Sequence, residues 1–195
     1  VGILADLQGP KIRIGQLSVE PLVLNDGDRV YLTVDQEQGR ASGYIYVDYP
    51  TLIEDVTLRG EIFLADGMIE LKIIEIGETA LQCEVISGGE LTSKKGVTLP
   101  GGPANLPALM EKDRSDLEFI IKEQVDLIAL SFARKAEHIL EIRELVNNLG
   151  GDQLLIAKIE NEEGLKNSEE ILQVADGIMV ARGDLGVEIP VEEVI

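Results

Sequence analysis

Short apolar segments separated by turn signals dominate the first half of the chain. Residues 1 to 5 form an apolar run typical of a buried strand, and a polar turn follows it. From about residue 14 to residue 97, β-prone runs alternate with turn sequences such as Asp66-Gly67. An Asp-Gly pair between two such runs is typical of a β-hairpin. We therefore predict a single strand within residues 1–13 and a small all-β domain over residues 14–97.

The second half, from residue 98 to residue 195, has a different pattern. After Gly101-Gly102-Pro103, segments with helical spacing of apolar residues alternate with continuous apolar runs. This alternation indicates βα units on a parallel sheet. The helices and strands that it predicts are, in chain order, 111–124, 125–132, 136–149, 154–160, 168–175 and 177–181.

Composition and charge narrow the class of protein. The chain has 195 residues, of which 45% are hydrophobic, which is enough for a sizeable core. It carries 17 Lys and Arg against 36 Asp and Glu, a formal net charge of −19. Nucleic acid and anionic membranes attract basic surfaces, so we expect neither as a partner.

The single cysteine and the single histidine exclude several chemistries. Cys83 has no partner for an internal disulfide, and no apolar run approaches the ~18 residues of a membrane helix. We therefore predict a soluble, cytoplasmic protein. Cys83 is expected to be a small buried hydrophobe and His138 a surface residue. One residue of each kind cannot build a catalytic Cys-His pair or a zinc site.

Polar residues fall at the carboxyl ends of the predicted parallel strands. In a (β/α)₈ barrel that end of the sheet carries the chemistry, although polar residues are also common in any loop. The residues concerned are Asp6, Ser131, Lys158, Glu160 and the segment Arg182-Gly183-Asp184.

Lys158 and Glu160 form the most informative pair. They are two residues apart in a predicted strand, so both side chains point to the same side of the sheet. One interpretation is a purely structural ion pair. The other adds Asp184, because two carboxylates from neighbouring strand ends suit Mg²⁺. A lysine beside that metal would stabilise negative charge on a transferring phosphoryl group or an enolate.

Three further features have ordinary structural explanations. The segment Arg182–Gly186 reads as a glycine-bearing turn, although its backbone amides could also bind a carboxylate. Lys94-Lys95 reads as a solvated surface pair. Asp66 reads as part of its hairpin turn.

Four segments together resemble pyruvate kinases, in the order and spacing of that family. The resemblance implies an α/β fold, a (β/α)₈ barrel of which this chain holds about strands three to six, interrupted after the third strand by a small all-β barrel domain. The segments are Asp6-Leu7-Gln8-Gly9-Pro10-Lys11-Ile12-Arg13, Ser93-Lys94-Lys95-Gly96-Val97, Ala157-Lys158-Ile159-Glu160-Asn161 and the run from Met179 to Pro190.

The activity that the resemblance implies is phosphoryl transfer from phosphoenolpyruvate to ADP, giving pyruvate and ATP in glycolysis. By motif, Glu160 and Asp184 are the expected Mg²⁺ ligands, and Lys158 neutralises the phosphoryl group in flight. The backbone amides of Gly183 and Asp184 are expected to hold the substrate carboxylate.

Further substrate contacts are implied by the same resemblance. Ser131 and Phe132 are expected to line the phosphoenolpyruvate pocket. Arg13, Lys95 and Asp66 are expected to meet ADP or ATP when the β domain closes as a lid.

The chain departs from the family pattern at two positions. Lys11 stands where potassium-dependent members have Glu, and members with Lys there are similar to potassium-independent enzymes. A fixed ammonium group can replace K⁺, while Asp6 and Leu7 still match the K⁺ position, so K⁺ binding stays open. Ala65 replaces an Asp that often precedes the Asp66 position.

The ends suggest a fragment, because the chain begins in a strand and stops in what looks like the start of a helix. Family residues for the monovalent cation, the substrate and enolate protonation, and the regulatory domain, are expected outside it. We expect a homotetrameric parent and an inactive isolated 195-residue chain.

Two alternatives stay open. A metal-dependent aldolase or lyase acting on a pyruvate enolate would share the Glu and Asp metal pair, but it would not need an insertion carrying Ser93-Lys94-Lys95-Gly96. A non-catalytic binding fragment is the second alternative, and the joint presence of Lys158, Glu160 and Asp184 argues against it.

Overall fold

The computed structural model describes residues 1–100 and 106–194, so Gly101-Gly102-Pro103 lies outside the described residues. The chain divides into two compact units. The first consists of Val1–Lys11 and Leu106–Ile195, and the second of Ile12–Asn105.

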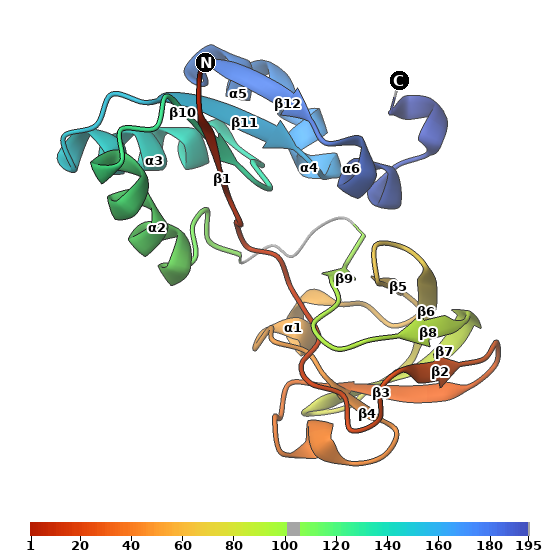
Figure 1. Ribbon diagram of the computed structural model, residues 1–195. Coiled ribbons are helices and arrows are strands. Elements are labelled where there is room, and N and C mark those ends of the chain that lie inside the picture. The colour runs from red at the N-terminus through yellow and green to blue at the C-terminus, as the bar shows by residue number, and fades with distance from the viewer. Residues whose placement is uncertain (101–105, 195) are drawn as a thin grey trace. The chain divides into compact units, whose positions relative to one another are not determined.

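The first unit is built on a four-stranded parallel sheet with the order β1-β10-β11-β12 (Figure 1). Strand and helix alternate along the chain, as the sequence pattern predicts. The elements are β1 (Leu4–Leu7), α2 (Glu111–Lys122), β10 (Leu127–Leu130), α3 (Ala136–Asn148), β11 (Leu154–Ile159), α4 (Glu162–Lys166), α5 (Ser168–Val174), β12 (Gly177–Val180), α6 (Arg182–Glu188) and the 3₁₀ turn Val191–Glu193.

One hydrophobic core joins the helices of this unit to the sheet. Leu117 of α2 and Ile139 of α3 lie in the same buried cluster as Ile128, Leu155 and Ala157 of the strands, and each of these side chains is fully buried. The apolar spacing that predicts the helices is therefore the spacing of the residues that face the sheet.

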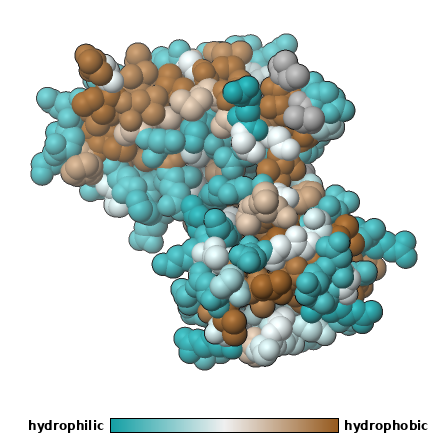
Figure 2. Space-filling view, turned by 45° about the vertical axis from the view of Figure 1, so that its right-hand side comes forward, coloured by the Kyte–Doolittle hydropathy of each residue, from teal (hydrophilic) through white to brown (hydrophobic). Residues whose placement is uncertain are grey.

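The outer strands β1 and β12 leave apolar side chains uncovered. Leu4, Ile178, Met179 and Val180 are all exposed, and Figure 2 shows hydrophobic side chains gathered on the surface of this unit. Strands of a parallel sheet are normally covered on both faces. The exposure fits an open sheet of four strands. No helix in the described ranges, 1–100 and 106–194, is long and apolar enough to cross a membrane.

In its described residues, 12–100, the second unit is all-β apart from two short helical turns. A six-stranded sheet has the order β4-β3-β7-β6-β5-β9, and β2 pairs with β8. The elements are β2 (Leu22–Leu24), β3 (Arg29–Thr33), the 3₁₀ turn Gln38–Arg40, β4 (Tyr44–Tyr46), α1 (Leu52–Asp55), β5 (Glu61–Leu64), β6 (Ile69–Ile76), β7 (Ala80–Ser87), β8 (Gly89–Leu91) and β9 (Val97–Thr98).

Residues 12–15 link the two edges of the six-stranded sheet. On one side the Asp48 N–H, just after β4, donates to the Arg13 carbonyl at 2.9 Å. On the other side the Ile14 N–H donates to the Lys95 carbonyl, just before β9, at 2.9 Å. The sheet is thereby closed into a small barrel. The short strands and hairpin turns of the sequence predict an all-β unit here, and the family resemblance implies the barrel.

Candidate active site

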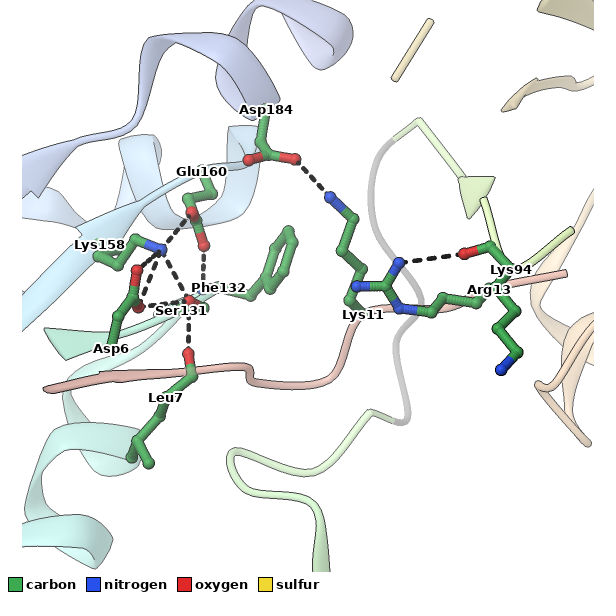
Figure 3. Close-up of polar contacts among 10 residues, drawn as sticks. All are labelled: Asp6, Leu7, Lys11, Arg13, Lys94, Ser131, Phe132, Lys158, Glu160 and Asp184. Atoms are coloured by element: carbon green, nitrogen blue, oxygen red, sulfur yellow. Dashed lines mark hydrogen bonds and ion pairs between the residues drawn. The ribbon is translucent and has the colours of Figure 1, made fainter. Parts of the chain in front are cut away.

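A cluster of polar side chains occupies the carboxyl end of the parallel sheet in the first unit (Figure 3). The Lys158 Nζ lies 3.0 Å from Glu160 Oε1, 3.1 Å from both carboxylate oxygens of Asp6 and 2.8 Å from Ser131 Oγ. These groups come from β1, β10 and β11 or from the residue directly after each strand. The structure thus brings four of the predicted site residues into contact around one ammonium group.

The strand alternation explains why Lys158 and Glu160 share one side. Ala157 and Ile159 point to the other side, into the hydrophobic core, with exposed fractions of 0% and 2%. Directly after Glu160, the Asn161 side chain caps α4 by accepting from the Gly164 N–H at 2.7 Å. The cap ends the strand at this point and holds the backbone on which Glu160 sits.

Ser131 and Phe132 connect β10 to its two neighbours. The Ser131 hydroxyl donates to the Leu7 carbonyl at 2.7 Å, and it lies 3.3 Å from Asp6 Oδ1. Phe132 has a φ of 56°, in the left-handed region that a bulky residue rarely adopts. Its N–H donates to Glu160 Oε2 at 2.6 Å. A strained backbone position therefore presents an amide to the carboxylate.

The cluster holds Lys158 in its charged form. Burial by itself would lower the pKa of Lys158, but the hydrogen bonds and negative charges of Glu160 and Asp6 outweigh burial and raise that pKa above its ordinary value. For Glu160, burial raises the pKa, and the charge of Asp184 adds to this, while Lys158 and the Phe132 N–H act against it. Burial and Asp184 outweigh Lys158 and the Phe132 N–H, so the pKa of Glu160 is raised above its ordinary value.

Asp184 lies in α6, and its Oδ1 is 3.2 Å from the Lys11 Nζ (Figure 3). The prediction of a glycine-bearing turn over Arg182–Gly186 is wrong, because these residues form the first part of helix α6. The reason is tertiary: Leu185 is 1% exposed and anchors the helix, which outweighs the low helix propensity of Gly183. The Gly183 and Asp184 amides lie in the first turn of α6.

The donor set can be tested for its fit to Mg²⁺. Glu160 and Asp184 supply hard carboxylate oxygens, and they are close enough for the charge of Asp184 to raise the pKa of Glu160. Each carboxylate is paired with an ammonium group, Glu160 with Lys158 and Asp184 with Lys11. Within residues 1–100 and 106–194, no three His, Cys, Asp or Glu side chains converge on a metal position. The two carboxylates are the kind of hard oxygen donors that Mg²⁺ takes, and they fit it by their chemistry.

The other predicted site residues lie in the second unit, around the backbone of Gly96. Arg13 forms a β-bridge with Gly96, and its guanidinium donates to the Lys94 carbonyl at 3.1 Å. The Ala65 N–H donates to the Gly96 carbonyl at 3.0 Å, which brings the turn carrying Asp66 to the same place. Arg13, Lys95 and Asp66 therefore sit on adjoining backbone segments of one unit.

Some features of the first unit have no counterpart in the sequence-based predictions. Helix α4 is only five residues long, too short for a periodic signal. The Glu188 carboxylate accepts from the Glu162 N–H at 3.1 Å, and burial raises the pKa of Glu188 to about 7.

The Asp113 carboxylate accepts from the Met110 N–H at 2.9 Å, three residues before it. That acidic residue at the third position of a helix was a usable signal.

The two residues set aside on sequence grounds can also be placed. Cys83 is fully buried in the second unit, and burial raises the pKa of its thiol to about 12. His138 is half-buried rather than on the surface, and burial lowers its pKa. The next residue, Ile139, belongs to the hydrophobic core, so His138 lies beside the buried side of its helix.

Comparison with known proteins identifies the family. The model of the pyruvate kinase barrel domain matches residues 1–195. Pyruvate kinases of Staphylococcus epidermidis and Geobacillus stearothermophilus are 43% and 46% identical over 100% of this chain and 33% of their own length. The pyruvate kinase of Clostridium perfringens is 44% identical over 98% of the chain and 41% of its own length. The chain thus spans about a third of these relatives. Its parallel sheet, its inserted β barrel and this match together confirm the predicted fold class, and the chain belongs to the pyruvate kinase family.

Proposed function

We propose that the full-length protein that carries this chain transfers a phosphoryl group from phosphoenolpyruvate to ADP and so forms pyruvate and ATP. The observation that carries the proposal is the contact of Lys158 with Asp6, Ser131 and Glu160 at the carboxyl end of the sheet, in a chain of this family. The family assignment speaks against the aldolase or lyase alternative.

Lys158 is the proposed catalytic residue. In the reaction the bond between phosphorus and the enol oxygen of phosphoenolpyruvate breaks, and a bond from phosphorus to an oxygen of the ADP β-phosphate forms. The enolate that is released then takes a proton at carbon and becomes pyruvate. Because its neighbours raise the pKa of Lys158, its ammonium stays charged and can neutralise the phosphoryl oxygens during transfer.

Glu160 and Asp184 are the proposed ligands of Mg²⁺. When bound, the cation would polarise the phosphoryl and enolate oxygens as a Lewis acid. The Phe132 N–H donates to the Glu160 carboxylate, and the Asn161 side chain caps the helix that begins directly after Glu160, so the backbone on both sides of the proposed ligand is bonded.

The substrate carboxylate is proposed to bind at the backbone amides of Gly183 and Asp184. Ser131 and Phe132 are proposed to line the same pocket. Support comes from their contacts, because the Ser131 hydroxyl accepts from Lys158 and the Phe132 N–H donates to Glu160. Ser131 thus touches the proposed catalytic lysine and Phe132 touches a proposed metal ligand, which supports the proposal.

Arg13, Lys95 and Asp66 of the second unit are the proposed nucleotide-binding residues. Arg13 and Lys95 place two cationic side chains on paired backbone segments of a chain whose net charge is −19. Such a local concentration of positive charge favours a polyphosphate.

We propose that K⁺ is not required, because Lys11 supplies a fixed positive charge beside Asp184. Asp6 and Leu7 are the proposed K⁺ position if one exists, and their contacts with Lys158 and Ser131 already satisfy them in part. We also propose that the full-length protein is cytoplasmic and forms a homotetramer.

The test is pyruvate formation by the full-length protein with phosphoenolpyruvate, ADP and Mg²⁺, in the presence and absence of K⁺. We expect ADP-dependent turnover that requires Mg²⁺ and changes little with K⁺. A folded protein without ADP-dependent turnover would contradict the proposed reaction, and turnover that depends steeply on K⁺ would contradict the role given to Lys11.

A further inference from the structure

A buried carboxylate outside the candidate active site fastens the loop that leaves strand β1. Asp113, in the first turn of α2, is 1% exposed. Its Oδ1 accepts from the Gly9 N–H at 3.1 Å, and its Oδ2 accepts from the Met110 N–H at 2.9 Å. One side chain thus caps its own helix and holds a loop that lies 104 residues earlier in the chain.

The loop is held on its other side as well. Gly9 has a φ of +67°, and a Cβ at this position would lie 2.8 Å from the Ser131 carbonyl oxygen. The Gly9 carbonyl accepts from the Lys11 N–H at 2.9 Å. The backbone at Gly9 is therefore packed against Ser131, anchored by Asp113, and continued by a tight turn into Lys11.

The loop leads directly into Lys11 and sets where its side chain starts. Its Nζ reaches Asp184 Oδ1 at 3.2 Å, and the side chains of Lys11 and Asp184 are 25% and 38% exposed. A long lysine side chain loses considerable freedom when it is held in one place, so a fixed start of the side chain lowers the cost of that contact. Two residues before Lys11 the Gly9 N–H donates to Asp113 Oδ1 at 3.1 Å, and directly after Lys11 the Ile12 carbonyl accepts from the Val97 N–H at 3.0 Å, so the backbone from which the side chain starts is anchored.

We propose that Asp113 is a positioning residue for the reaction, which acts through Gly9 and the turn to Lys11 and so sets where the Lys11 ammonium stands beside Asp184. The inference rests on the proposed function, because Asp184 is a proposed ligand and substrate-binding residue there. Both contacts of the Asp113 carboxylate that carry this inference are with backbone N–H groups, and Asp113 is not among the proposed substrate or metal contacts. Its two carboxylate oxygens are both needed, since each accepts from a different backbone N–H.

The experiment is a double-mutant cycle on kcat in the full-length protein, with Asp113→Asn, Lys11→Met and the double variant. Asn keeps only one acceptor oxygen, so we expect Asp113→Asn to lower kcat by about tenfold when Lys11 is present. In the Lys11→Met background the same change is expected to cost less than about twofold, because the group that Asp113 positions is gone. A purely structural role would lower kcat by the same factor in both backgrounds.

Asp116→Asn is the matched control, because Asp116 lies three residues further along α2, where its partly exposed side chain pairs with Lys112. We expect it to leave kcat unchanged in both backgrounds. If Asp113→Asn does not fold, Asp113→Glu takes its place in the cycle, since it keeps both acceptor oxygens but moves them by one methylene group, and the same loss of effect with Lys11→Met is expected.

The outcomes separate the two proposals. A wild-type protein without turnover overturns the proposed function. Turnover in the wild type, with equal effects of Asp113→Asn in both backgrounds, overturns the inference about Asp113 and leaves the proposed function standing.

Discussion

The Lys158 ammonium lies 3.0 Å from the Glu160 carboxylate, and the two side chains are only 12% and 3% exposed. Two charges at this depth stabilise each other, and each would be costly to bury alone. Asp6 adds a second carboxylate to the same ammonium. The arrangement explains how charged groups persist at the end of an otherwise apolar strand.

Replacement of Lys158 by Met is expected to destabilise the fold, because it leaves the buried Glu160 carboxylate without its ammonium partner. We expect a loss on the order of 3 kcal/mol near neutral pH. Burial already raises the pKa of Glu160, and in the variant Lys158 no longer opposes that rise. At low pH Glu160 is protonated in the variant, and the cost of a buried unpaired carboxylate disappears. The loss in free energy of unfolding relative to the wild type therefore grows from about pH 5 to about pH 8. Urea unfolding of the wild type and the variant at both pH values, in EDTA, measures this loss in stability. An equal loss at both pH values would contradict the role given to the Glu160 carboxylate.

Asp176 provides a second, independent test of the electrostatics. The Leu155 N–H and the Arg143 guanidinium both donate to its carboxylate at 2.8 Å and lower its pKa below 3.8. A lowered carboxyl pKa stabilises the fold above the ordinary pKa, and the contribution is lost as the pH falls through the folded value. Asp176→Asn should therefore cost roughly 0.5 to 1 kcal/mol at neutral pH, after allowance for solvent screening.

The measurement for Asp176 is the free energy of unfolding as a function of pH, with Asp152→Asn, an exposed residue, as the control. The cost of Asp176→Asn should be present at neutral pH and disappear in acid, as the pH falls through the lowered pKa of Asp176. If the loss of stability caused by Asp176→Asn were the same at every pH, the contacts with Arg143 and with the Leu155 N–H would not lower the pKa of Asp176.

Cys83 reports on the integrity of the second unit. The thiol is fully buried, and burial raises its pKa to about 12, so almost no thiolate exists at neutral pH. Because it is the only cysteine of these 195 residues, an aromatic disulfide reagent should release no chromophore from the native 195-residue chain and one equivalent after urea unfolding. Rapid labelling of the native protein would show that the barrel opens easily.

The sequence predicts the sheets well where the signal is local or periodic. Alternation around Lys158 places Ala157 and Ile159 in the core and the charged side chains together, and the structure has this arrangement. The hairpin at Asp66-Gly67 connects β5 to β6, as an Asp-Gly pair predicts.

What the sequence does not predict depends on contacts between distant residues. The segment Arg182–Gly186 looks like a turn because of its glycines, yet burial of Leu185 makes it helical. The pairs Lys11 with Asp184 and Gly9 with Asp113 join residues more than a hundred positions apart. No local pattern encodes such contacts, since they follow from the way the sheet and its helices pack.

The most direct test of the central claim is the turnover of Lys158→Met in the full-length protein, with Lys166→Met as the matched control. Lys166 is 67% exposed in α4, where its ammonium group lies 2.7 Å from Glu162 Oε1, so its loss should leave kcat unchanged. Loss of the Lys158 ammonium should lower kcat for pyruvate formation by about 10²-fold or more. A folded Lys158→Met protein that keeps wild-type turnover would contradict the assignment of Lys158 as the group that stabilises the transferring phosphoryl.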